Sequence, residues 1–201
     1  MAIKFQYNKT VLHNLNKQLK IRLKALPTLK NKEAALRLEV KKAKDRTVNL
    51  DEKLRKEMSG QEDSAGLWNE FLPELIQIDN VRVSSKKIAG VSVPVMEEII
   101  FKEKDYSLFS SPNWFPPGIS YAKELANIVI EREFYARKMA LLDRARKKTT
   151  QKVNLYEKVQ IPGYEDAIRK IRRFLEDEEN LSKSAQKIVK KRQQKQKAAT
   201  A

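Results

Sequence analysis

The sequence predicts a mainly α-helical protein in which two long arms, one at each end of the chain, pair as an antiparallel coiled coil. Three observations support this fold class. Apolar residues near both ends recur at alternating spacings of three and four, which places them on one face of a helix. The segment between the arms changes to the alternating pattern of a small β-hairpin. The net charge is also unevenly distributed: residues 1–60 carry +10, residues 61–120 carry −4 and residues 121–201 carry +10.

These observations divide the chain into three parts. Residues 1–60 form an N-terminal coiled-coil arm, and residues 61–120 form an acidic insert with a short β-hairpin and a Pro-rich loop. Residues 121–201 form a C-terminal coiled-coil arm whose basic end is expected to fray, because it has seven basic residues and no acidic residue beyond Ser182. We expect the basic arms and the acidic insert to meet different partners.

Composition excludes several classes of protein. The chain has no cysteine, which rules out a disulfide and a thiolate metal site. Its first residues lack the apolar core of a secretory signal, and no run of about 18 apolar residues is present. The sequence therefore predicts a cytoplasmic protein that does not span a membrane.

The N-terminal arm is expected to begin near Asn8–Thr10, where Asn and Thr can cap free backbone N–H groups, and to end at Gly60. Pro27 lies inside the apolar pattern and predicts a kink, because proline removes one helical hydrogen bond. The pattern resumes after Pro27, which favours one bent helix over two separate helices. Three seam positions are polar, and two readings stay open for them: they fix the register of the pair, or they lie at the edge of the seam with their polar ends in water. They are Arg22, Glu33 and Thr47.

The C-terminal arm is expected to begin near Ser120 and to carry the matching stripe. Pro162 and Gly163 interrupt this stripe, which then resumes one residue out of phase and so predicts a kink or a local change of winding. The predicted seam of both arms comprises Leu12, Leu15, Leu19, Leu26, Leu29, Leu36, Val40, Leu50, Leu54, Leu125, Ile128, Met139, Leu142, Val153, Ile168, Ile171 and Leu175.

In the insert, β-branched residues alternate on both sides of a polar stretch, Ser84–Lys87, which predicts a hairpin with its turn there. Pro94 restricts its strand to the edge of a sheet. The segment Ser111–Gly118 is predicted as a loop because of its prolines. Its aromatic residues Trp114 and Phe115 are expected to pack under the helices, with a binding role as the alternative. The residues singled out in the insert are Ile88, Gly90, Val91, Val93, Pro94, Trp114 and Phe115.

The sequence contains no constellation of catalytic residues. Its five glycines form neither a phosphate-binding loop nor a dinucleotide fingerprint. The single histidine, His13, is not part of an HExxH motif, so we interpret it as a solvated residue or one at the edge of the seam. The acidic run Glu176–Glu179 is read as a solvated helix face, since consecutive helical residues point in different directions. We therefore predict no catalytic residue, no cofactor and no metal site.

Three segments resemble the D subunit of the V-type (archaeal/vacuolar-type) rotary ATPase and ATP synthase family, in its bacterial branch. They are Asn8–Thr10 with Leu26–Arg37, then Ala89–Pro94, and Arg146–Glu179, in which Val-Asn-x-x-Glu-x-x-x-Ile-Pro is the most specific motif. The resemblance covers nearly the whole chain. Around Pro27-Thr28 the chain departs from many members, which carry a longer basic helical stretch there.

The resemblance implies a central-stalk rotor shaft that carries no catalytic residues itself. Its termini would enter the catalytic head of A and B subunits, where ATP is made or hydrolysed. The insert would lie near the F subunit and the C/d-type subunit that couples to the membrane ring, so that ATP turnover drives proton or sodium transport. Such a protein would sit at the cytoplasmic face of the membrane. Two alternatives remain from the residues alone: a basic coiled coil that binds nucleic acid, and a prefoldin-like chaperone.

Overall fold

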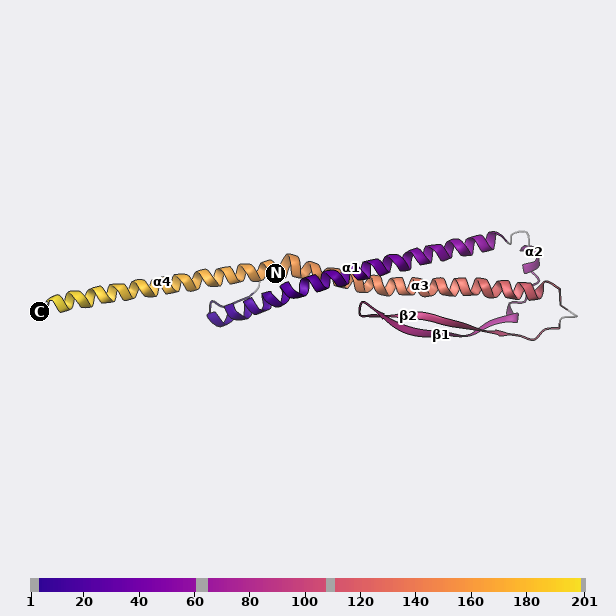
Figure 1. Ribbon diagram of the computed structural model, residues 1–201, viewed down its shortest axis with the longest axis horizontal. Helices are drawn as coiled ribbons and strands as arrows, with labels where there is room; N and C mark the ends of the chain where they lie inside the picture. The colour runs from indigo at the N-terminus through magenta and orange to yellow at the C-terminus, as the bar shows by residue number, and fades with distance from the viewer. Residues whose placement is uncertain (1–3, 61–64, 108–110, 200–201) are drawn as a thin grey trace. The chain divides into compact units, whose positions relative to one another are not determined.

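A computed structural model describes residues 4–60, 65–107 and 111–199, and its elements are labelled in Figure 1. It confirms a mainly α-helical fold with one antiparallel hairpin between long helices. The elements in chain order are α1 (Lys9–Ser59), α2 (Ala65–Trp68), a 3₁₀ turn (Pro73–Leu75), β1 (Ile76–Ile88), β2 (Val91–Glu103), α3 (Phe115–Leu155), a π-helical segment (Tyr156–Gln160) and α4 (Ile161–Ala199).

The chain forms two units, each of which contains part of both arms. We call residues 1–31 with 150–201 the terminal unit, and residues 32–149 the middle unit. Each unit has its own core. The polar run that was predicted to end the first arm includes residues 61–64, which lie outside the described residues.

Helix α1 begins where the sequence predicts. The side-chain oxygen Oδ1 of Asn8 accepts a hydrogen bond of 2.7 Å from the backbone N–H of Val11, which satisfies one of the free donors of the first turn. The helix then continues through Pro27 without a break and ends at Ser59. One continuous helix is therefore confirmed, and a bend at Pro27 stays a prediction.

In the terminal unit, α1 and α4 pack antiparallel through one apolar stripe each. Leu15 of α1 is buried in a cluster with Ala167, Ile168 and Ile171 of α4. The Lys30 side chain reaches Glu157, so that rising residue numbers on α1 meet falling numbers on its partner. Helix α4 continues to Ala199, so the basic tail is helical in the structure, and its fraying stays a prediction.

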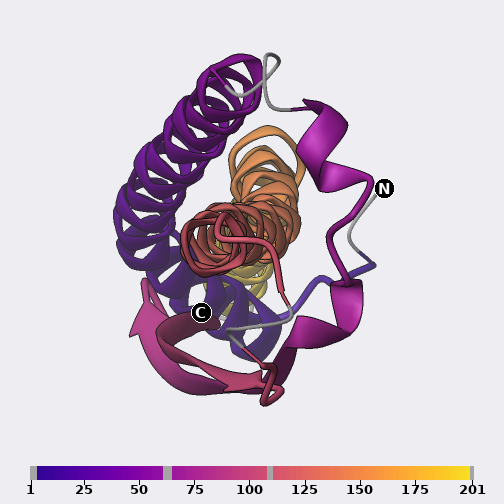
Figure 2. The same cartoon turned by 90° about the vertical axis from the view of Figure 1, so that its right-hand side faces the viewer.

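In the middle unit, α1 pairs with α3 in the same antiparallel sense, and the hairpin lies against the pair. Leu36 of α1 and Leu142 of α3 enclose Val93 of β2, and all three side chains are fully buried. Seen along the helices in Figure 2, α3 lies in the middle of this unit, with α1, the hairpin and the segment containing α2 around it.

The hairpin turns two residues later than predicted. The polar stretch Ser84–Lys87 is part of β1, and the turn is formed by Ala89 and Gly90, which have φ angles of 49° and 76°. Two positive φ angles in succession match the right-handed twist of hairpin strands, and glycine adopts them without steric cost. Polarity alone therefore misplaced the turn. The register skips Asp79 on β1 and Glu97 on β2, which places a bulge in each strand.

Helix α3 begins at Phe115, five residues before the predicted Ser120. The predicted loop is thus wrong for residues 115–118, which form the first turn of the helix. Proline is tolerated there because the N–H groups of a first turn have no partner within the helix. Pro116 and Pro117 therefore start α3 instead of interrupting it.

The one-residue offset of the C-terminal stripe coincides with the π-helical segment Tyr156–Gln160. The backbone N–H of Ile161 donates to the carbonyl of Tyr156, five residues earlier, where an α-helix would use the fourth. A π turn of this kind accommodates one additional residue. Pro162 follows directly and cannot donate a backbone hydrogen bond.

Replacing Gly90 by alanine should destabilise the protein by about 1–2 kcal/mol, because an L-residue in the left-handed region brings its Cβ close to its own backbone. A Cβ at this position would also lie 3.4 Å from Nζ of Lys32, whose flexible end can move away. Urea denaturation of the full chain, followed by circular dichroism, measures the free energy of unfolding.

The matched control is Gly66→Ala. Gly66 lies in α2, and the place that a Cβ would take there has no neighbouring atom within 4 Å, so this substitution should be neutral or stabilise by up to about 1 kcal/mol. Equal stability of the wild type and Gly90→Ala would show that the turn does not require glycine.

Candidate functional site

The predicted seam residues all lie on the inner side of their helices. Among the described residues, none of the seventeen is classed as exposed. The fully or nearly fully buried members are Leu15, Leu36, Leu50, Ile128, Leu142, Val153, Ile168 and Ile171. The half-buried members are Leu12, Leu19, Leu26, Leu29, Val40, Leu54, Leu125, Met139 and Leu175.

The three polar seam residues do not all make the same kind of hydrogen bond. The guanidinium of Arg22 crosses to the partner helix, where its Nε donates to Oε1 of Gln160 at 2.6 Å. Two hydrogen bonds lie within α1: the Thr47 hydroxyl donates to the carbonyl of Ala43, and the Glu33 carboxylate accepts from Arg37. Arg22 therefore makes a polar contact with the partner helix, and its role in fixing the register stays a prediction.

The hairpin end is held by apolar contacts with both helices of the middle unit. Ile88, Ala89 and Val91 pack around the buried cluster of Leu36, Val93 and Leu142. Of the predicted insert residues, Ile88, Val91 and Val93 thus meet next to the turn, whereas Trp114 and Phe115 belong to a separate cluster. Gly90 itself is exposed at the tip.

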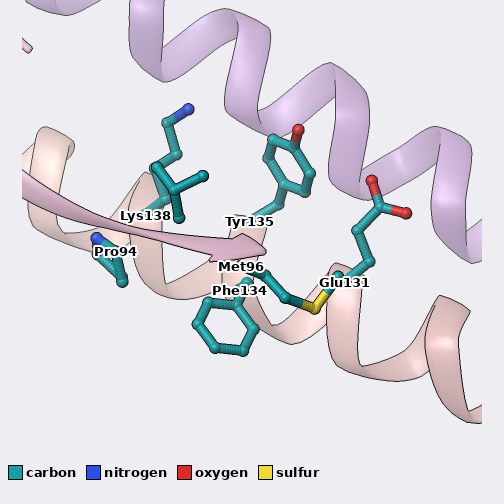
Figure 3. Close-up of a pocket in the computed structure, with 7 residues that line it drawn as sticks. Pro94, Met96, Glu131, Phe134, Tyr135 and Lys138 are labelled. Carbon is teal, nitrogen blue, oxygen red and sulfur yellow. The ribbon is translucent and has the colours of Figure 1, made fainter. Parts of the chain in front are cut away.

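A pocket of about 110 Å³ opens between β2 and α3, large enough for one side chain (Figure 3). Its lining combines predicted Pro94 with residues that the sequence reasoning missed. The helical members recur at spacings of three, one and three, which is a signal for one helix face that could have found them. The lining residues are Pro94, Val95, Met96, Glu131, Phe134, Tyr135 and Lys138.

Charged groups surround the rim of this pocket. Nη2 of Arg46 on α1 lies 2.8 Å from Oε1 of Glu131, and its guanidinium lies 5.9 Å from the ring centroid of Tyr135. The hydrogen bond to the Glu131 carboxylate raises the pKa of Arg46, with a further contribution from the charge of that carboxylate. Lys138 lies 5.4 Å from the same ring centroid. The pocket therefore combines apolar lining residues with charged groups of both signs, Glu131, Arg46 and Lys138.

The two predicted aromatic residues of the insert pack internally. Phe115 is buried with Leu75 and Ile119, and Trp114 contacts the rings of Trp68 and Phe71. These contacts favour the packing interpretation over the binding alternative. The indole Nε1 of Trp114 is buried without a hydrogen-bond partner in the part of the chain that the structure describes.

In the distal part of α4, from Leu181 to Gln196, the side chains that the structure describes are exposed. Leu181 is 72% exposed, and Ile188 and Val189 are each more than half exposed. Basic residues lie among them, including the exposed Lys190 and Lys191. Exposed apolar side chains and solvated charges thus share this part of the helix.

Over residues 4–60, 65–107 and 111–199 the structure has no group of three or more side chains placed to hold a metal ion. Glu179 of the acidic run pairs with Lys183, and this hydrogen bond lowers the pKa of the carboxyl. In the same ranges, no helix is both long and apolar enough to cross a membrane. His13 is an exposed residue of α1.

Comparison with known proteins agrees with these features. Residues 11–191 match the family described as the ATP synthase D subunit. The V-type ATP synthase D subunit of Borreliella burgdorferi is 31% identical over 192 residues, which are 93% of this chain and 94% of the relative. The protein of the same name from Chlamydia muridarum is 31% identical over 86% of this chain and 87% of its own, and that of Chlamydia caviae is 30% identical over 86% and 85%. The chain therefore belongs to the ATP synthase D-subunit family.

Proposed function

We propose that this protein is the non-catalytic central-stalk shaft of a V-type rotary ATPase or ATP synthase. It would transmit rotation between the catalytic head and the membrane ring, and so couple ATP synthesis or hydrolysis to proton or sodium transport. The observation that carries the proposal is family membership over almost the full length of both this chain and its relatives. The antiparallel helix pairs within each unit support it, because paired helices resist bending and twisting better than one.

The partners follow from the same proposal. The exposed, basic distal part of α4 would contact the head, which consists of A and B subunits. The hairpin and the pocket beside it would contact the F subunit of the stalk or the C/d-type coupling subunit. The complex would lie at the cytoplasmic face of the membrane, with nucleotides bound by the head subunits and not by this chain.

Coexpression with the A, B and F subunits of the same organism tests the proposal. We expect the full chain to copurify with them as one complex by size-exclusion chromatography, and ATP hydrolysis by that complex to rotate a bead attached to this chain. A chain that fails to copurify contradicts the proposal. Tight RNA or duplex DNA binding that falls steeply with salt would favour the nucleic-acid alternative.

Neutralising four basic residues of distal α4 should weaken assembly with the head, because exposed charges at an interface mainly raise the association rate. The variant carries glutamine at Lys187, Lys190, Lys191 and Arg192, all exposed. At low salt we expect association about tenfold slower, with the difference shrinking as salt screens the charges.

The control for this variant removes four charges from the middle unit. It carries glutamine at Lys41, Lys44, Lys53 and Lys56, which are also exposed. We expect association close to that of the wild type. An equal loss in both variants would mean that net charge matters and that distal α4 has no particular role.

The pocket is tested with Phe134→Gln, which makes its lining polar without adding a charge. We expect about tenfold weaker binding of the F subunit in a titration with the purified full chain, because one apolar contact is worth about 1–2 kcal/mol. Val129→Gln is the control, since Val129 is an exposed apolar residue of α3 outside the pocket. Unchanged binding of the F subunit by Phe134→Gln would remove the pocket from the proposed interface with that subunit.

A further inference from the structure

We propose that Arg22 and Lys30 of α1 form a register lock, which fixes the place where the C-terminal helix changes its winding. That change occurs in the π-helical segment Tyr156–Gln160 of the terminal unit. None of the segment's side chains is fully buried. Packing of the segment itself therefore does not explain its position.

The apolar pattern requires one additional residue between two buried positions. Val153 and Ile161 both face the inside of the terminal unit, although they are separated by eight residues where a heptad has seven. A π turn accommodates the surplus residue and leaves both on the same face. Pro162 favours such a turn before it, because its ring would clash with the carbonyl of Lys158 in a regular α-helix. The surplus residue and the proline ring therefore require a π turn between Val153 and Pro162, but they do not determine at which residue it begins.

Two side chains of α1 contact the segment and select its position. Nε of Arg22 donates to Oε1 of Gln160 at 2.6 Å, at the C-terminal end of the π turn. The same guanidinium lies 5.8 Å from the ring centroid of Tyr156, the first residue of the segment, and 4.5 Å from that of Tyr164 in the first turn of α4. Nζ of Lys30 lies 2.8 Å from Oε1 of Glu157.

Moving the π turn would break these contacts. Each residue of a helix is rotated by about 100° from the one before. If the π turn moved past Gln160, the Gln160 side chain would therefore turn away from α1, and the same holds for Glu157. The apolar stripe beyond Ile161 would keep its phase in every case. The Lys30–Glu157 pair is about half exposed, and such pairs add little to stability. They nevertheless suffice to select among positions of nearly equal free energy.

Amide hydrogen exchange of the full chain tests the lock, with Arg22 and Lys30 both replaced by methionine. If the lock is lost, the π turn moves along the helix and opens its hydrogen bonds. We expect amides of residues 154–163 to exchange about tenfold faster than in the wild type, while those of residues 165–175 keep their rates. This outcome does not depend on the proposed function, because no partner is present.

The matched control is the Lys20→Met/Lys24→Met variant, which removes the same charge from exposed positions on the same part of α1 and should leave exchange unchanged. Wild-type rates in the Arg22→Met/Lys30→Met variant would overturn the lock. So would an equal rise through residues 165–175, since the contacts would then only hold the helices together. If that variant loses helical content, Lys30→Met alone is measured by the same criterion.

Discussion

Each long helix of this chain has one apolar stripe, and the rest of the structure depends on keeping that stripe turned toward a partner helix. Leu36 is fully buried, whereas Leu38 on the same helix is 54% exposed. Leu142 is likewise buried and its neighbour Leu141 is 43% exposed. A rotation of about 100°, which is one residue, therefore exchanges core and surface. The fold therefore requires that the angular position of the apolar stripe around each helix axis stays the same along the whole helix.

Proline has three different effects on that phase. At the start of α3, Pro116 and Pro117 occupy the first turn, where they cost no hydrogen bond and set where the helix begins. Pro27 lies inside α1, where the helix continues around it. Pro162 follows a π turn that absorbs one surplus residue. The same residue type thus begins one helix, is tolerated in a second and accompanies a change of winding in a third.

The long-range pattern was predictable from the sequence because it repeats. Seam residues such as Leu15 and Ile171 are identified by many concordant spacings, so one irregular position does not hide the others. The hairpin turn was misplaced because polarity at Ser84–Lys87 is a weaker signal than the positive φ that Gly90 permits. The pocket was missed for a different reason. Local spacing places its helical members on one face of α3, but the pocket itself depends on how β2 lies across that face, which local spacing does not encode.

Apolar burial alone does not specify one alignment of these helices. A slip of seven residues brings leucine opposite leucine again, so the stripe tolerates it at modest cost. The ion pairs between helices do not repeat in this way. Arg46 meets Glu131 and Arg132 meets Asp51 in the middle unit, while Lys30 meets Glu157 in the terminal unit. Each pair is partly exposed and contributes at most about 1 kcal/mol.

A slipped alignment would lose these pairs within a unit. The seam therefore supplies most of the attraction between the helices, and the charged pairs select the register. For a protein proposed to transmit rotation, this division of roles has a mechanical consequence. Many interchangeable apolar contacts would carry the load. A few polar contacts would fix the alignment of the helices and so the position of each surface residue. Residues such as Arg22, which lie on the seam yet bond across it, belong to the second group.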